Sequence, residues 1–186
     1  MTETHLSVLV FERFLAKVLK IIGPFFVACF VFYFLILSRG EVNGSSMQPN
    51  FVDQEHFLIN KILYLVTTPQ RFDVVQIIEP NKEKYIIKRV IGMPGETVTI
   101  KDGKIFLTFA FENTKTTTTI QLDESRYLPT GISTKPAFGL DPYKSQSITA
   151  TNNEYIVLGD NRNNSTDSRV YGPIPRSQII GKVIQY

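Results

Sequence analysis

Ser46 lies in a short segment whose residue types favour a turn, Gly44-Ser45-Ser46-Met47-Gln48-Pro49-Asn50-Phe51. Small residues and a proline disfavour a long helix or a central strand at this place. A serine on such tight backbone either helps to form the turn or acts as a nucleophile. A serine hydroxyl is a poor nucleophile until a base takes its proton. The chemistry of Ser46 therefore depends on whether the chain also supplies a base.

Lys88 is the candidate base, because it lies in an apolar stretch, Tyr85-Ile86-Ile87-Lys88-Arg89-Val90-Ile91, that precedes a Pro-Gly turn. A free lysine has a pKa of ~10.4 and is protonated at neutral pH. Burial favours the neutral amine and can lower the pKa by several units. The alternative is a strand lysine that reaches solvent. Arg89 points to the opposite face of the strand, so one of the two side chains must face inward or toward a cleft.

A third segment, residues 159–169, is dense in polar groups and directly follows the apolar stretch Tyr155-Ile156-Val157-Leu158. Its charged residues offer ion pairs that could hold a loop rigid, and Ser165 or Ser168 could hydrogen-bond a lysine amine and orient it. The alternative is a solvated turn. The charged candidates in this segment are Asp160, Arg162, Asp167 and Arg169.

The composition of the 186 residues excludes several other classes of function. The net charge is +3, and the basic residues are scattered rather than gathered in a stripe, which disfavours nucleic-acid binding. A single cysteine, Cys29, rules out a disulfide within the chain. The two histidines, His5 and His56, are far apart, so we expect neither a Ser-His-Asp triad nor a His/Cys metal site, and we expect no cofactor.

An apolar run near the N-terminus predicts a membrane anchor. The stretch Ile21–Leu37 contains no charged residue and, with its flanks, reaches the ~20 residues that cross a bilayer. A cleavable signal peptide is the alternative, but residues 35–41 offer no small-x-small site, so we expect an uncleaved anchor at 21–38. The positive charges concentrate before this run. This asymmetry predicts that residues 1–20 lie in the cytoplasm and residues 39–186 lie outside. These charges are Arg13, Lys17 and Lys20, against Arg39 after it.

Beyond the anchor the sequence predicts a mostly β, antiparallel domain at residues 39–186. Short apolar segments alternate with turn residues, and Asp102-Gly103 between alternating segments is a strong hairpin signal. The threonine-rich run 114–119 predicts an exposed hairpin tip or an edge strand, and residues 121–151 predict loops with short strands. The predicted strands cover 57–66, 71–78, 84–93, 98–107, 155–158 and 179–186.

These motifs together resemble a type I signal peptidase, the bacterial leader peptidase, in their order and approximate spacing. The resemblance runs from the anchor to the C-terminus, and the eleven-residue motif at 159–169 is its most specific part. The matching motifs are Ser46-Met47-Gln48-Pro49, Arg71-Phe72-Asp73-Val74-Val75, Lys88-Arg89-Val90-Ile91-Gly92-Met93-Pro94-Gly95 and the segment from Gly159 to Arg169.

The resemblance implies a Ser–Lys dyad in which Ser46 is the nucleophile and Lys88 the general base. Ser165 resembles the serine that orients the lysine. Asp167 and Arg169 resemble the supporting ion pair, with Asp160 and Arg162 in the same network. The backbone N–H of Ser46 resembles one oxyanion-hole donor. Some members add a hydroxyl two residues before the nucleophile, where this chain has Gly44.

Three further positions depart from the family pattern, and none of them removes a catalytic group. Asn50 stands where threonine is usual, Met93 where leucine is usual and Glu96 where aspartate is usual. The family's fold is β-rich with a variable insertion, which we expect at about residues 105–150.

The function that the resemblance implies is a membrane-anchored serine endopeptidase. It would remove signal peptides from exported preproteins at small-x-small sites, commonly Ala-x-Ala, at the outer face of the plasma (inner) membrane. Its partners would be preproteins, the lipid bilayer and the translocation machinery. Two alternatives stay open: a specialised peptidase with few substrates, serving conjugation, a pilus or an organelle's inner membrane, and a membrane-anchored β-domain that binds peptides without catalysis.

Overall fold

The computed structural model describes residues 3–80, 82–110, 116–141 and 143–186. The chain divides into two compact units, Met1–Ser38 and Arg39–Tyr186, and each is described by itself.

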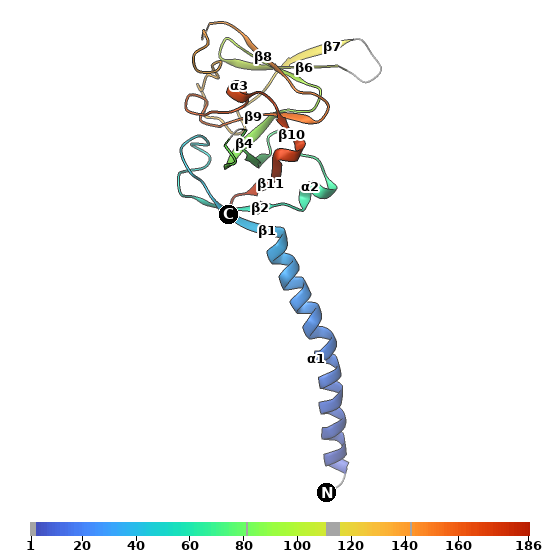
Figure 1. The fold of residues 1–186 in the computed structure, drawn as a ribbon. Coiled ribbons are helices and arrows are strands. Elements are labelled where there is room, and N and C mark those ends of the chain that lie inside the picture. The colour runs from blue at the N-terminus through green and yellow to red at the C-terminus, as the bar shows by residue number, and fades with distance from the viewer. Residues whose placement is uncertain (1–2, 81, 111–115, 142) are drawn as a thin grey trace. The chain divides into compact units, whose positions relative to one another are not determined.

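The first unit is a single helix, α1 (Glu3–Ile36), of 34 residues (Figure 1). Its stretch Glu12–Val31 is long and apolar enough to cross a membrane, and none of that stretch is buried against the rest of the chain. The helix begins well before the predicted anchor, so most of the predicted lead at 1–20 belongs to the same helix. Residues 37 and 38 lie in a strand that follows it.

The second unit consists of two antiparallel sheets, which confirms the predicted mostly β fold class. In Figure 1, β6 (Lys104–Ala110), β7 (Thr117–Gln121) and β8 (Gln146–Thr149) gather at one end of this unit, and β2 (His56–Asn60) and β11 (Ile179–Ile184) at the other.

The larger sheet has seven strands in the order β1 (Leu37–Glu41), β2 (His56–Asn60), β11 (Ile179–Ile184), β3 (Val74–Ile78), β4 (Tyr85–Gly92), β9 (Glu154–Leu158) and β10 (Ile174–Pro175). The smaller has four, in the order β7 (Thr117–Gln121), β6 (Lys104–Ala110), β5 (Thr97–Lys101) and β8 (Gln146–Thr149). Among the residues of this unit that the structure describes, three short helices complete the fold: α2 (Leu63–Val66), α3 (Ser168–Tyr171) and η1 (Arg176–Gln178).

The smaller sheet contains the predicted hairpin. Strands β5 and β6 pair around Asp102 and Gly103, which both have positive φ angles of the kind that tight hairpin turns require. Strand β7 lies at the edge of this sheet, and part of the predicted run 114–119 lies outside the described residues.

One predicted strand, 57–66, is wrong in its second half. Strand β2 ends at Asn60, and the short helix α2 follows. The Asn60 side chain explains the change, because its Oδ1 accepts a hydrogen bond of 2.9 Å from the backbone N–H of Leu63. Such a local side-chain bond satisfies a free N–H at the start of a helix and competes with strand pairing.

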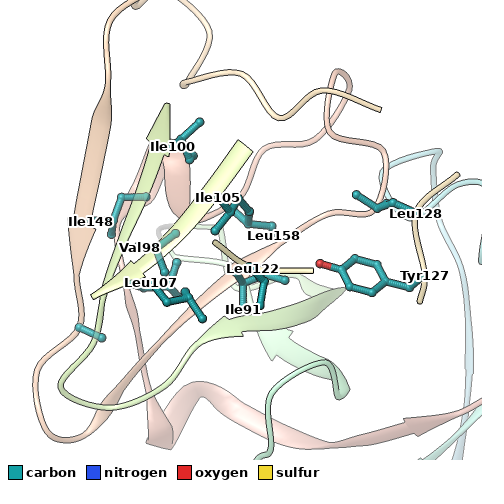
Figure 2. Packing of buried hydrophobic residues seen from close by; sticks show 12 residues of the cluster. Ile91, Val98, Ile100, Ile105, Leu107, Leu122, Tyr127, Leu128, Ile148 and Leu158 are labelled. Carbon is teal, nitrogen blue, oxygen red and sulfur yellow. The ribbon is translucent and has the colours of Figure 1, made fainter. Parts of the chain in front are cut away.

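A buried apolar cluster joins the two sheets (Figure 2). Ile91 from β4 and Leu158 from β9 pack in it with side chains from β5, β6 and β8, and the Tyr127 ring extends into it from the 127–128 segment. Because the cluster excludes water, it fixes the end of β4 relative to the smaller sheet. The members from the smaller sheet are Val98, Ile100, Ile105, Leu107 and Ile148.

Strand β4 is central in the larger sheet, between β3 and β9, and it carries Lys88. Lys88 lies opposite Val75 of β3, and the next residue, Arg89, lies opposite Leu158, the last residue of β9. The polar segment 159–169 begins directly after Leu158. The sheet register therefore delivers this segment to the immediate neighbourhood of Lys88.

Candidate active site

The Ser46 turn is held by apolar side chains on either side of its polar residues. Met47 and Phe51 are buried in one cluster with Ile87 of β4. The Phe51 N–H donates to the Met47 carbonyl at 3.0 Å, which closes the turn. Because Met47 and Ile87 are the chain neighbours of Ser46 and Lys88, their packing brings the hydroxyl and the amine together.

Lys88 and Ser46 contact each other directly. The Lys88 Nζ lies 2.7 Å from the Ser46 Oγ, and Nζ also donates to the Ile87 carbonyl at 3.0 Å. The lysine is 3% exposed and has no carboxylate within ion-pair distance among the described residues. Burial lowers the pKa of Lys88 to about 8, although the negative charges of Asp167, Glu79 and Asp160 oppose the shift. Roughly a tenth of the amine is then neutral at pH 7, and a neutral amine can accept a proton.

Arg89 is buried as well, on the other face of β4. Its Nε and Nη2 donate to the two carboxylate oxygens of Asp160 at 2.8 and 2.5 Å, in a bidentate pair. The sequence requires that one side chain of the Lys88–Arg89 pair faces inward or toward a cleft. In the structure both side chains are buried. Asn50 joins this pair to the Ser46 turn, since its Nδ2 donates to Asp160 Oδ2 at 2.8 Å.

Asp167 and Arg169 form the ion pair that the sequence motif indicated. Arg169 Nη2 lies 2.7 Å from Asp167 Oδ2, and Nε donates to Oδ1 at 2.8 Å. The same carboxylate accepts from the backbone N–H of Gly159 at 3.0 Å, and Arg169 Nη1 donates to the carbonyl of Arg162 at 2.6 Å. Both side chains are buried, so the pair ties the two ends of the 159–169 segment together.

Arg162 is held by residues that the sequence analysis did not single out. Its Nη2 pairs with Glu124 at 2.6 Å and contacts the Tyr127 hydroxyl at 3.1 Å, while Nη1 donates to Thr134. Burial raises the pKa of Tyr127 above its ordinary range, so its hydroxyl is neutral. The loops at 121–151 gave no pattern from which these contacts could be predicted.

Ser165 and Ser168 differ in what their hydroxyls do. Ser168 Oγ accepts a hydrogen bond of 2.9 Å from the backbone N–H of Val157 and is therefore occupied. Ser165 Oγ is buried and makes no hydrogen bond, so the expected bond to Lys88 is not made in this structure. Gly159 separates Ser165 from the turn: a Cβ added to Gly159 would overlap the Ser165 side chain and lie 2.5 Å from the Ser46 carbonyl oxygen.

Gly44 has a φ of +96°, and a Cβ added there would meet nothing within 4 Å. Its N–H donates to Asp53 Oδ1 at 2.6 Å and is therefore committed to that carboxylate. The N–H of Ser46 makes no hydrogen bond to any other residue that the structure describes. It is available to a ligand, whereas the N–H of Gly44 is not.

A cavity of about 140 Å³ opens beside Ser46. Three consecutive residues of β4 form one wall, and the segment that follows β1 forms the other. The lining residues are Glu41, Val42, Asn43, Ser46, Phe57, Gln76, Tyr85, Ile86 and Ile87. Within the described residues, no group of three or more His, Cys, Asp or Glu side chains stands close enough to hold a metal ion.

The sequence is similar to known proteins over most of its length. Residues 15–186 match the model of a family described as signal peptidase, peptidase S26. Signal peptidase I V of Bacillus subtilis is 35% identical over 147 residues, which cover 77% of this chain and 81% of the relative. Signal peptidase IB of Staphylococcus aureus is 30% identical and covers 85% of this chain and 81% of its own.

Two further similarities cover less of one of the two chains. A probable signal peptidase I-2 of Synechocystis is 32% identical, and the match covers 76% of this chain and 58% of the relative. A crystal structure of a signal peptidase I from Enterococcus faecalis is 25% identical and covers 64% of this chain and 99% of its own, with a TM-score of 0.46. The family match spans nearly the whole sequence and agrees with the Bacillus subtilis relative: the chain belongs to the signal peptidase family, peptidase S26.

Proposed function

We propose that this protein is a serine endopeptidase that removes signal peptides from exported preproteins, with Ser46 as nucleophile and Lys88 as general base. Membership in the signal peptidase family supports the reaction class. The observation that carries the assignment of residues is the distance of 2.7 Å between a buried lysine amine and the Ser46 hydroxyl. This pair meets the geometric requirement for a nucleophile and its base.

The first half of the reaction forms an acyl-enzyme. Ser46 Oγ attacks the carbonyl carbon of the scissile peptide bond while the neutral amine of Lys88 takes the hydroxyl proton. The carbonyl oxygen becomes an oxyanion, and the C–N bond then breaks. The Lys88 ammonium gives its proton to the departing amine, which becomes the new N-terminus of the mature protein.

The second half releases the signal peptide. Lys88, again neutral, takes a proton from a water molecule that attacks the ester carbon. The ester C–O bond breaks, Ser46 Oγ recovers its proton from the lysine, and the signal peptide leaves with a free carboxylate. One amine thus serves as base and acid in both halves, and it must change protonation state near the working pH. The lowered pKa of Lys88, about 8, suits that task.

The oxyanion requires hydrogen-bond donors, and the free N–H of Ser46 is the first of them. Gly44 supplies no hydroxyl, and its N–H is bound to Asp53, so a second donor must come from elsewhere. Removal of one donor of this kind typically costs ~2.7–4 kcal/mol of transition-state stabilisation.

The 159–169 segment supports the dyad. Asp167 and Arg169 fix the segment, Arg162 ties it to the 124–134 loops, and Asp160 neutralises Arg89 behind the lysine. We assign to Ser165 the orientation of Lys88, because its hydroxyl is buried, unbonded and adjacent to Gly159.

The cavity beside Ser46 supports a preference for small side chains before the cut, as in Ala-x-Ala. Its volume of about 140 Å³ is well below the ~300–1,000 Å³ of pockets that take drug-sized ligands. An extended substrate lying beside residues 85–87 would present alternate side chains to this cavity.

We further propose that α1 crosses the plasma membrane with its N-terminus in the cytoplasm and the β unit outside. The stretch Glu12–Val31 supports the span. Its basic residues all lie in its N-terminal part, before Ile21, and this position supports the orientation. Anchoring on the membrane that also holds the signal peptide raises the effective concentration of the substrate.

The test is cleavage of a preprotein with an Ala-x-Ala site by the full chain in liposomes, with the products identified by mass. Wild type should cut after the second alanine, and Ser46→Ala and Lys88→Ala should not. Ser45→Ala and Lys101→Ala are matched controls, because they change a neighbouring serine and an exposed strand lysine, and they should cut. Cleavage by Ser46→Ala at the wild-type rate would contradict the proposed nucleophile.

A further inference from the structure

Asn161 binds the backbone of the Ser46 turn at two consecutive carbonyl groups. Its own N–H donates to the Ser46 carbonyl at 3.0 Å, and its side-chain Nδ2 donates to the Ser45 carbonyl at 3.0 Å. The two bonds come from one residue and reach one turn, so they fix the orientation of the turn as well as its position. Neither bond touches the Ser46 hydroxyl or the Lys88 amine.

The side-chain bond to the Ser45 carbonyl determines where the Ser46 N–H points. The peptide unit that joins Ser45 to Ser46 is planar and trans, so its C=O and its N–H point in opposite directions. Asn161 holds the C=O on the side of the 159–169 segment. The N–H of Ser46 must then point away from that segment, and it makes no hydrogen bond within the described residues.

Asn161 is itself held firmly. Its carbonyl accepts a bond of 3.0 Å from the N–H of Asn164, and its neighbour Asp160 is locked in the bidentate pair with Arg89. Gly159 packs against the Ser46 carbonyl from the same side. A rigid donor can impose an orientation on a turn, whereas a mobile one would follow it.

We propose that Asn161 is a positioning residue, whose side-chain amide orients the Ser46 N–H toward the oxyanion of the transition state. The proposal rests on the proposed function, since it assumes that Ser46 is the nucleophile. It goes beyond that function by assigning to a residue outside the dyad the task of setting the oxyanion donor. Asn161 acts through the peptide unit and does not touch the substrate.

The principal test compares Asn161→Ala with Asn164→Ala in preprotein cleavage. Both variants remove a side-chain amide of the same segment that contacts Ser45, but Asn164 Nδ2 bonds the Ser45 hydroxyl, at 2.9 Å, and not its carbonyl. We expect kcat to fall about 10- to 100-fold in Asn161→Ala, part of the ~10²–10³-fold effect of losing an oxyanion donor. KM should change less than about twofold, and Asn164→Ala should keep nearly full kcat, because only the carbonyl bond sets the peptide plane.

A second readout separates positioning from general loosening of the site. A peptide aldehyde would add to Ser46: a C–O bond forms from Oγ to the aldehyde carbon, and the carbonyl oxygen becomes an oxyanion as the hydroxyl proton moves to Lys88. Its inhibition constant should rise in Asn161→Ala by about the factor by which kcat/KM falls. The affinity for an uncleavable peptide of the same sequence should stay unchanged. The pH midpoint of kcat should also stay at the wild-type value, since Asn161 does not contact Lys88.

Asn161→Asp covers the case in which the alanine variant unfolds. It keeps the size and the backbone N–H bond, but a carboxylate cannot donate to the Ser45 carbonyl, so kcat should fall at least as far as in Asn161→Ala. A wild-type kcat in either folded variant would overturn the proposal and leave the dyad intact. A wild type that cuts no preprotein would instead refute the proposed function, and this inference with it.

Discussion

Lys88 and Arg89 are consecutive, buried, basic residues on opposite faces of β4, and their hydrogen-bond partners differ. Arg89 meets both oxygens of Asp160. Lys88 meets a hydroxyl and a carbonyl and has no carboxylate partner within the described residues. Guanidinium cannot lose its charge in a protein, so a buried arginine needs a counter-ion, whereas a buried lysine can become neutral.

The contrast shows how one strand can hold both a fixed charge and the amine that we propose as the base. Asp160 contributes to both faces: it pairs with Arg89, and it raises the pKa of Lys88 through its more distant charge. Burial nevertheless remains the largest influence on the pKa of Lys88. The proposed role of Lys88 therefore depends on Asp160 pairing with Arg89 and not with Lys88.

The largest effect on cleavage should come from replacing each of the two basic residues, in separate variants, by the other type. Lys88→Arg should lose at least about 1,000-fold in kcat, because an arginine at this position stays protonated and cannot act as a base. Arg89→Lys should keep measurable cleavage, since a lysine can still pair with Asp160. Both variants would be assayed on the same preprotein at pH 8. An active Lys88→Arg enzyme would contradict the assignment of the base.

Removal of the counter-ion should destabilise the fold on the Arg89 side. Asp160→Asn leaves a buried guanidinium without its carboxylate, and breaking a buried pair in this way costs about 3–5 kcal/mol of unfolding free energy. Asp141→Asn, which changes an exposed aspartate, is the control. Urea unfolding of the Arg39–Tyr186 unit within the full chain would measure the difference. Equal stability of the two variants would mean that the Arg89–Asp160 pair is not needed.

Removal of the lysine should have the opposite effect on stability. Burial lowers the pKa of Lys88 from 10.5 to about 8, so the folded state is destabilised by up to about 3 kcal/mol at any pH below 8. Between pH 8 and 10.5 the unfolded state binds more protons, and the stability of the wild type rises. Lys88→Met should thus be inactive, yet its free energy of unfolding at pH 7 should exceed that of the wild type. This difference in stability should shrink toward pH 10. Thermal unfolding at pH 7 and pH 10 would test this expectation.

The smallest effect concerns the pH dependence of cleavage. In the wild type, kcat/KM should rise with pH and level off above about pH 8, as Lys88 loses its proton. Glu79 is buried, and its negative charge raises the pKa of Lys88, so Glu79→Gln should move the midpoint down by a few tenths of a pH unit. Glu154→Gln, at the start of β9 and beyond the Gly92 end of β4, should leave the midpoint in place. An upward shift in Glu79→Gln would contradict the sign of this interaction.

The sequence predicted those parts of the structure that local pattern or motif determines. The hairpin at Asp102 and Gly103 follows from turn chemistry, and the motif spacing indicates Ser46 and Lys88, which lie in contact in the structure. The partners of Arg162 were not predictable, because Glu124 and Thr134 come from loops without periodicity and reach the site only through tertiary packing. The sequence left open which of Lys88 and Arg89 faces inward, and the structure buries both, because both faces of β4 are covered.

Gly159 has a consequence for how the sequence can vary. The Ser46 carbonyl and the Ser165 side chain close in on it so tightly that even one methyl group has no room. Every substitution at this position adds a side chain. We therefore expect no single substitution of Gly159 to be neutral. The loops at 124–134 could change gradually, one contact at a time. At Gly159, by contrast, any first substitution would already push the Ser46 turn away from the 159–169 segment that holds it.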